Sequence, residues 1–455
     1  MIRALRALTS RQFQQYLLFL IIPGLSLKRW LGVGAIGIAF MTMGIMFSLN
    51  ISTGPTFISF LESVTLRNES PYLRGAVFIG LGLAGAIIAS FGLSMSLGKV
   101  GQRTRHWPLL DSLYVERVLS SGPKITVIGG GSGLPNLLRG LKHYTSNISA
   151  IVTVADDGGS SGRLREELGI LPPGDIRNCL VALADSEYVM QQLMDYRFKS
   201  DGQLDGHSFG NILIAALAGI RGDFSSGVEV AAELLAIRGR VIPSTPESVT
   251  LVGSTVSGKT LIGETMVGNS GDSFQSLTLV PADPAAHPDA VRAIEEADMV
   301  VIGPGSLYTS LVPNLLISGI STALANSPAL KVYVCNVAEE PAQTVGYSVQ
   351  DHLDLVVNYG SESSIDAVIA NNNVPEGPTP AGLDFIQIDK PWTSDVILVA
   401  ADVIDESDAS KSARHDPVKL SNAIAEAYRQ YRGTRRRLTR VRLNLKNPRK
   451  HQQPN

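Results

Sequence analysis

Glycines cluster directly after a short apolar run of β type at 125–128, and a run of helical character follows at 134–141. The cluster consists of Gly129, Gly130, Gly131, Ser132 and Gly133. Glycine lets the backbone turn tightly and approach a phosphate, and the next helix N-terminus presents unpaired N–H groups. Leu134 stands where the last glycine of the dinucleotide fingerprint would be. We therefore expect a phosphate-binding turn, with a tight turn that holds no ligand as the alternative.

Carboxylates follow a second apolar run at 148–154. Asp156 and Asp157 come first, and the candidate ligand-binding residues after them are Gly158, Gly159, Ser160 and Arg163. Carboxylates at the end of a second strand commonly bind a ribose or hold a divalent ion beside a phosphate. They are therefore candidates for ligand binding, for Mg²⁺ and for catalysis. The structural alternative is that Ser161 caps a helix beginning at Gly162, with both aspartates near its dipole.

Three further polar segments could face the same cleft. The candidate residues are Asp175, Arg177 and Asn178 in 172–178, His207 and Asn211 in 206–211, and Gly303, Gly305, Ser306, Tyr308 and Thr309 in 301–310. Asp175 could instead cap the helix that follows it, and a lone histidine at a helix start is more often structural. The last segment is a second glycine turn after an apolar run. Together, the two turns predict two phosphate- or base-binding loops at one sheet edge.

One motif is discounted. Residues 253–260 match the P-loop pattern letter for letter, but the pattern is meaningful only between a strand and a helix. A strand is expected at 261–264, and Gly263, Gly268 and Gly271 argue against a continuous helix. We expect a hairpin tip at 256–258.

Composition narrows the possible partners and compartment. The formal net charge of −2 gives no signal for nucleic-acid binding. The two cysteines, Cys179 and Cys335, lie in apolar runs, which favours a reducing compartment over a disulfide framework. The segment 432–455 is rich in arginine and lysine and carries no acidic residue. We expect it to be disordered, either touching anionic headgroups or merely solvated.

Two segments, 30–61 and 75–98, carry no charged residue, and each is long enough to cross a bilayer. Buried core helices are the alternative. Lysine and arginine flank the pair on its outer sides, which predicts that both ends are cytoplasmic. The expected organisation is a cytoplasmic segment 1–29, a transmembrane hairpin 30–98 with spans near 30–50 and 76–97, a linker 99–122, a ligand-binding domain 123–431 and the basic tail.

The part of the chain after the linker alternates apolar strands with helical runs. Expected strands are 125–128, 150–154, 299–302 and 330–335, and expected helices are 134–141, 176–184, 189–196, 211–220, 228–237 and 288–297. This order predicts a Rossmann-like, doubly wound, mostly parallel α/β sheet. Between Gly239 and Val280, short β runs at 248–252, 261–265 and 276–280 predict a small antiparallel insertion.

Five ordered blocks make residues 124–431 resemble the gluconeogenesis factor (YvcK-like) family of the CofD-like superfamily: 127–133, 153–165, 172–178, 206–211 and 302–315. The resemblance implies a bacterial UDP-sugar-binding protein, with a UDP-GlcNAc-like ligand, needed for cell shape and gluconeogenic growth. It adds Asn336 to the candidate ligand residues. The family's acidic residues are replaced here by Gln343 and Val345, which puts in doubt whatever those carboxylates do.

Three functions compete. The first is a regulatory nucleotide-sugar binder at the cytoplasmic membrane, with envelope-synthesis proteins or a second copy as partners and no certain cofactor. The second is a Mg²⁺-dependent phosphotransferase like the superfamily's 2-phospho-L-lactate transferases, with Asp156 and Asp157 holding the metal. The third is a membrane scaffold with a vestigial pocket. The sequence favours the first because it shows no clear nucleophile or His–carboxylate pair.

Overall fold

The computed structural model describes residues 27–49, 70–101, 118–361, 364–374, 384–389, 391–406 and 413–446. The chain divides into two compact units, Met1–Val118 and Leu119–Asn455. Each unit is described by itself.

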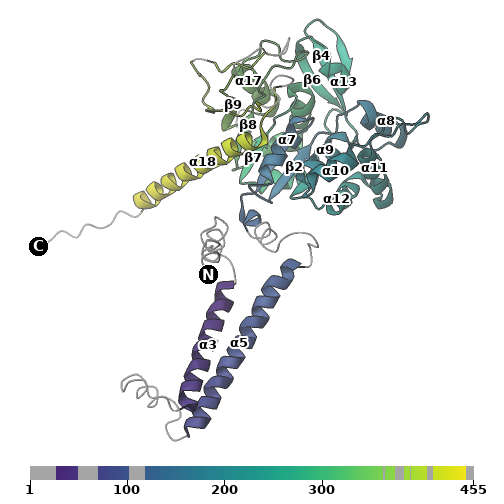
Figure 1. Ribbon diagram of the computed structural model, residues 1–455. Coiled ribbons are helices and arrows are strands. Elements are labelled where there is room, and N and C mark those ends of the chain that lie inside the picture. The colour runs from purple at the N-terminus through teal and green to yellow at the C-terminus, as the bar shows by residue number, and fades with distance from the viewer. Residues whose placement is uncertain are drawn as a thin grey trace, which may run out of the picture. The chain divides into compact units, whose positions relative to one another are not determined.

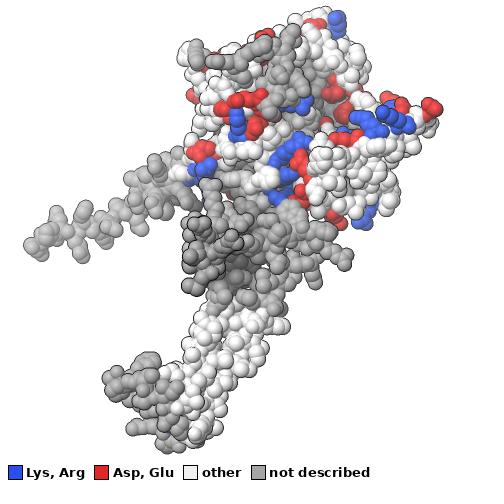
Figure 2. All heavy atoms as spheres, viewed as in Figure 1, with Lys and Arg blue, Asp and Glu red and all other residues white. Residues whose placement is uncertain are grey.

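In the first unit, helices α3 (Leu27–Ser48) and α5 (Pro71–Gly101) lie antiparallel and in contact (Figure 1). Glycines permit the approach, because a Cβ atom on Gly85 would lie 3.2 Å from the Cα of Gly37. On the face that Figure 2 shows, the described part of this pair carries no charged side chain. Among the described residues, one helix, Tyr72–Gly92, is long and apolar enough to span a bilayer, whereas the apolar stretch Gly32–Ser48 is shorter. The two-span hairpin therefore stays a prediction.

The second unit is built on one seven-stranded parallel sheet, which confirms the expected fold. Its strands are β1 (Ile125–Gly129), β2 (Ile148–Val152), β3 (Arg240–Pro243), β7 (Met299–Ile302), β8 (Leu330–Val334), β9 (Ala367–Asn371) and β10 (Ile397–Ala401), in the order β10-β9-β8-β7-β1-β2-β3. Every residue of β1, β2, β7 and β8 is buried, which explains their predominantly apolar sequences.

Helices pack on this sheet in two layers. One layer consists of α18 (Pro417–Lys446), α7 (Gly133–Leu141) and α9 (Gly174–Leu183), which contact one another in that order. The other layer consists of α14 (Pro288–Glu295), α16 (Ser318–Asn326) and α17 (Val349–Gly360). The remaining helices of this unit are η1 (Leu119–Ser121), α8 (Gly159–Leu168), α10 (Glu187–Met194), α11 (Phe209–Arg221), α12 (Phe224–Leu234), α13 (Glu264–Gly268), η2 (Leu307–Leu311) and α15 (Val312–Leu315). The six predicted helices all exist, with ends shifted by a few residues.

The strand order reverses beside β1. The chain runs outward from β1 through β2 to β3, then returns to β7 on the other side of β1 and runs outward again to β10. After β1 the chain therefore continues toward one side of the sheet, and after β7 it continues toward the other side. In open parallel sheets, ligands bind at such a switch point, outside the carboxyl ends of the strands.

The predicted insertion is a three-stranded antiparallel sheet, β5 (Thr260–Ile262), β4 (Thr250–Thr255) and β6 (Phe274–Val280). The P-loop-like letters lie on its β4–β5 hairpin, as expected. Two expectations were wrong. Arg240–Pro243 joins the main sheet beside β2, because its residues after Arg240 are apolar and buried. The run 261–265 is a strand only to Ile262, and Glu264–Gly268 forms the short helix α13.

The last helix extends beyond the predicted end of the domain. Helix α18 continues to Lys446, so 432–446 is helical rather than disordered. Arginine, leucine and lysine are good helix formers and dominate this stretch. Residues 447–455 of the predicted tail lie outside the described residues.

We predict that Gly140→Ala destabilises the second unit by roughly 1–3 kcal/mol, the usual cost of overpacking. A Cβ atom at Gly140 would overlap the carbonyl oxygen of Pro417, where α7 packs on α18. Gly219→Ala on α11 is the control, because no atom lies within 4 Å of the added Cβ and alanine is the better helix former. Urea unfolding followed by circular dichroism measures both. Equal midpoints for Gly140→Ala and the unchanged chain would contradict the packing argument.

Candidate functional site

The two glycine turns predicted from the sequence meet at the switch point. The first turn connects β1 to α7, and the second connects β7 to η2. Gly131 has a φ of +60°, in the left-handed region that favours glycine. A Cβ atom on Gly133 would lie 2.6 Å from the carbonyl oxygen of Pro304, and one on Gly305 would lie 3.3 Å from the oxygen of Gly130. The turns therefore pack backbone to backbone, a contact that side chains would prevent.

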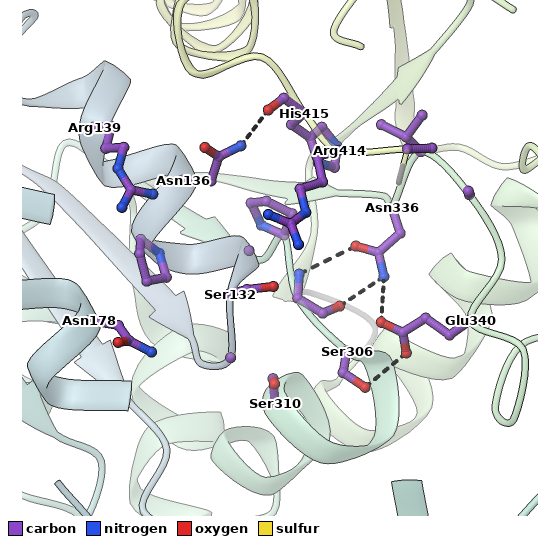
Figure 3. A pocket seen from close by; sticks show the side chains of 18 of the residues that line it. Ser132, Asn136, Arg139, Asn178, Ser306, Ser310, Asn336, Glu340, Arg414 and His415 are labelled. Carbon is purple, nitrogen blue, oxygen red and sulfur yellow. Dashed lines mark hydrogen bonds between the residues drawn. The ribbon is translucent and has the colours of Figure 1, made fainter. Parts of the chain in front are cut away.

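A cavity of about 440 Å³ opens between these turns (Figure 3). Its walls come from the two turns, from α7, α9 and α10, and from the segments that follow β8 and precede α18. The polar lining residues are Ser132, Asn136, Arg139, Asn178, Gln191, Asp195, Ser306, Ser310, Asn336, Glu339, Glu340, Arg414 and His415. Of the predicted ligand residues, Gly131, Ser132, Gly133, Asn178, Gly305, Ser306 and Asn336 line the cavity.

Two arginines face this cavity, and sequence reasoning identified neither. Arg139 on α7 forms an ion pair with Glu187, which also binds Lys142. Arg414 lies in the segment before α18, and no ion pair of its guanidinium is found among the described residues. Figure 3 shows its side chain reaching toward the two turns. A guanidinium in such a place suits a phosphate or carboxylate. Arg414 carried no local signal in the sequence, because it stands far from both glycine turns along the chain.

The second glycine turn is held by neighbouring side chains. Asn336 is bonded to Gly305 twice: its Oδ1 accepts from the backbone N–H at 3.3 Å, and its Nδ2 donates to the carbonyl at 3.0 Å. The Ser306 hydroxyl lies 2.8 Å from both Glu340 Oε2 and Gln343 Oε1. Burial raises the pKa of Glu340. A carboxylate of this chain therefore occupies the turn at which the sequence predicted phosphate binding.

Tyr308 and Thr309 do not line the cavity. The Tyr308 hydroxyl lies 2.7 Å from that of Tyr347, and its ring meets Phe274 edge to face. Thr309 is buried and bonds the carboxyl group of Glu264. These contacts tie η2 to the small antiparallel sheet, so both residues serve the architecture of the turn.

The predicted carboxylates gather beside the first turn. Asp175 Oδ2 accepts a hydrogen bond of 2.6 Å from the N–H of Gly131. Asp157 accepts from the N–H and the hydroxyl of Thr265, at 2.9 and 2.6 Å, and Asp156 accepts from the N–H of Gly158 at 2.9 Å. Burial raises the pKa of Asp175 to about 6 and that of Glu264 to about 7, and Asp156 contributes to both shifts.

Two capping predictions were wrong. Helix α8 starts at Gly159 with Gly158 as its N-cap, so Ser161 lies inside the helix. Helix α9 starts after Pro173, so Asp175 stands in the first turn and reaches Gly131 instead of capping. Within the described part of the chain, no group of three or more His, Cys, Asp or Glu is arranged to hold a metal ion. Asp156 and Asp157 accept hydrogen bonds from different backbone segments.

The remaining predicted site residues form a buried network beneath α8, α9 and α11. Arg177 donates to Ser208 Oγ at 2.6 Å, to Asn211 Oδ1 at 3.1 Å and to Asn178 Oδ1 at 2.8 Å. Ser160 Oγ lies 2.9 Å from His207 Nδ1 and accepts from Asn211 at 3.0 Å. Arg163 binds the carbonyl of Asp205. These residues position the helices around the site, and only Asn178 among them lines the cavity.

A parallel sheet in Rossmann-like order, with a ligand-sized cavity at its switch point, places the second unit in the doubly wound α/β class. A profile of the family described as 2-phospho-L-lactate transferase CofD matches residues 125–404. The chain belongs to the CofD family.

Three similar proteins indicate which members of this family the chain resembles. A protein from Nostoc sp. is 40% identical over 443 residues, which is 93% of this chain and 95% of that protein. The protein named gluconeogenesis factor from Bacillus subtilis is 44% identical over 255 residues, 56% of this chain and 80% of its own. A crystal structure of a Bacillus halodurans protein aligns with a TM-score of 0.64 and 39% identity, covering 67% of this chain and 100% of that one. These relatives support the predicted resemblance to gluconeogenesis factors.

We predict that Asp175→Asn removes a pH-dependent part of the stability. Because the folded-state pKa of Asp175 is about 6 and its ordinary value is 3.8, the folded state holds the proton more tightly. The contribution of Asp175 to stability is therefore full below pH 4 and is lost as the pH rises through 6. The loss is up to about 3 kcal/mol, at about 1.36 kcal/mol per pKa unit.

Asparagine can still accept the hydrogen bond from Gly131. The free energy of unfolding, measured between pH 4 and 7.5, should favour the aspartate at low pH and the variant at neutral pH. A difference between the two proteins that does not change with pH would contradict the assignment.

Proposed function

We propose that this chain is a membrane-anchored, nucleotide-sugar-binding regulatory protein that supports cell morphogenesis and envelope synthesis during gluconeogenic growth. The observation that carries the proposal is the first glycine turn, which opens at a helix N-terminus onto a cavity that Arg414 also lines. Backbone N–H groups and a guanidinium together suit a diphosphate. The cavity volume of about 440 Å³ lies within the range of small-molecule sites.

The uncharged lining suits the rest of such a ligand. Asn136, Asn178, Gln191 and Asn336 offer amide donors and acceptors, which hydrogen-bond bases and sugar hydroxyls. Regulation is preferred over catalysis because the described cavity wall holds no serine or cysteine bonded to a histidine. His415 in that wall is instead bonded to the carbonyl of Cys335, and burial lowers its pKa to about 4.

A Mg²⁺-dependent phosphotransferase is the second candidate. It is favoured by the name of the matching family and by the carboxylates Asp156, Asp157 and Asp175 beside the first turn. Thr265 donates both of its hydrogen bonds to Oδ1 of Asp157, so such a role would use the other carboxylate oxygen. Consumption of a nucleotide diphosphate-linked substrate with Mg²⁺, abolished in Asp157→Ala, would support this candidate over the regulatory one. The scaffold alternative requires that variants of the cavity behave as the unchanged protein in cells.

We predict that millimolar UDP-GlcNAc or UDP-glucose raises the melting temperature of the purified full chain, because a ligand that binds only the folded state stabilises it. Arg414→Ala should weaken binding about 10- to 100-fold, since hydrogen bonds to charged groups contribute about 1.5–3 kcal/mol. Arg292→Ala, an exposed arginine on α14 paired with Asp289, is the matched control. Calorimetric titration gives the dissociation constants. No shift with any UDP-sugar would refute the proposal.

We also propose that the first unit anchors the protein in the cytoplasmic membrane, with the second unit in the cytoplasm. The apolar stretches Tyr72–Gly92 and Gly32–Ser48 support this, as does the excess of lysine and arginine outside the pair. After cell lysis and a carbonate wash, the full chain should stay with the membranes, and a version that starts at Leu119 should be released. Recovery of the full chain in the washed supernatant would overturn the anchoring.

A further inference from the structure

The second glycine turn holds the carboxyl group of Glu340 at the cavity wall. Glu340 lines the cavity, and its carboxyl group accepts from the hydroxyl of Ser306 at 2.8 Å and from the N–H of Leu307. The Asn336 amide lies 3.4 Å from its other oxygen. No lysine or arginine forms an ion pair with Glu340 among the described residues. The carboxyl group is thus held by neutral donors only.

The hydrogen bonds at Ser306 show how this carboxylate is presented. The Ser306 hydroxyl has one proton, yet it lies 2.8 Å from Glu340 Oε2 and from Gln343 Oε1. That single proton can be donated to only one of the two oxygens, Glu340 Oε2 or Gln343 Oε1. With the Gln343 amide turned over, its NH₂ group donates to Ser306, and Ser306 donates to Glu340. Gln343 thereby completes a chain of donors that ends at the carboxylate.

Gln343 does not line the cavity itself, but it contacts Ser306 of the second turn. A glutamate at position 343 would place a second carboxylate beside Ser306, so the glutamine keeps the negative charge at this turn lower. Val345, two residues further along, is 65% exposed and does not line the cavity.

In Figure 3, Arg139 and Glu340 lie on opposite sides of the cavity, and the Arg414 side chain reaches toward the two turns. Asp195 also lines the cavity and pairs with Arg177. The end lined by the first turn and by arginine suits an anion, whereas the end at Glu340 repels one. A partly buried carboxylate without a cation is a strong acceptor for hydroxyl groups, and it repels a second negative charge placed beside it.

We propose that Glu340 is a specificity-determining residue: it accepts hydroxyl groups of a neutral sugar and excludes a sugar that carries a carboxylate. This inference rests on the proposed function, because it presumes a nucleotide sugar with its diphosphate at the first turn. The expected ligands are then nucleotide-linked neutral hexoses and N-acetylhexosamines. Nucleotide-linked uronic acids are excluded.

UDP-glucose and UDP-glucuronic acid provide the test, because they differ only in that a carboxylate replaces the CH₂OH group of the sugar. Calorimetric titration of the purified full chain should give at least about tenfold tighter binding for UDP-glucose, which corresponds to about 1.4 kcal/mol. Glu340→Gln should reduce that ratio to threefold or less, on the order of the uncertainty in such an affinity difference. Glu233→Gln, an exposed glutamate on α12, makes the same change of charge away from the cavity and should keep the ratio.

Gln343→Glu is the second variant, and it keeps the inference testable if Glu340→Gln does not fold. It adds a carboxylate beside Ser306 and should widen the preference for UDP-glucose. Melting curves without ligand confirm that each variant is folded. Equal binding of the two nucleotide sugars by the unchanged chain, or an unchanged ratio in Glu340→Gln, overturns the inference and leaves nucleotide-sugar binding intact. Failure of both ligands to bind refutes the proposed function, and the inference falls with it.

Discussion

The site depends on one contact, the approach of the first glycine turn to the second. Gly133 meets the backbone of Pro304, and Gly305 faces the oxygen of Gly130, at separations that leave no room for side chains. Because β1 and β7 are neighbours at the point where strand order reverses, both turns leave the same sheet edge. Their contact fixes the floor of the cavity, and the lining residues from α7, α9 and the segment before α18 are arranged around it.

Electrostatics then gives the two turns different roles. The first turn gives the N–H of Gly131 to Asp175, whose raised pKa shows how poorly that place solvates a charge. The second turn gives the hydroxyl of Ser306 and the N–H of Leu307 to Glu340. Both turns thus bind carboxylates of the chain. The arginines come from other parts of the cavity wall, Arg139 from α7 and Arg414 from the segment before α18.

Local patterns in the sequence were sufficient for the strands β1, β2, β7 and β8, because buried parallel strands are predominantly apolar runs. They were also sufficient to reject the P-loop letters, which require a helix where the structure has the β4–β5 hairpin. They were insufficient for Arg240–Pro243, whose short apolar run looks the same in an insertion and at a sheet edge. They were likewise insufficient to assign the roles of Arg177 and His207. Both side chains have the chemistry to bind a ligand, but in the structure Arg177 bonds Ser208 and His207 bonds Ser160.

The sequence by itself determined the class of fold and the position of the glycine turns, because strand periodicity and glycine conformation are local properties. Only the tertiary structure decided which polar residues share the cavity. Asn336 and Glu340, from the segment after β8, meet Arg414 there from a distant segment, and no motif in the sequence marked Glu340 or Arg414. Whether a carboxylate faces a ligand or a backbone N–H depends on which loops the strand order brings together, and that is a long-range property of the folded chain.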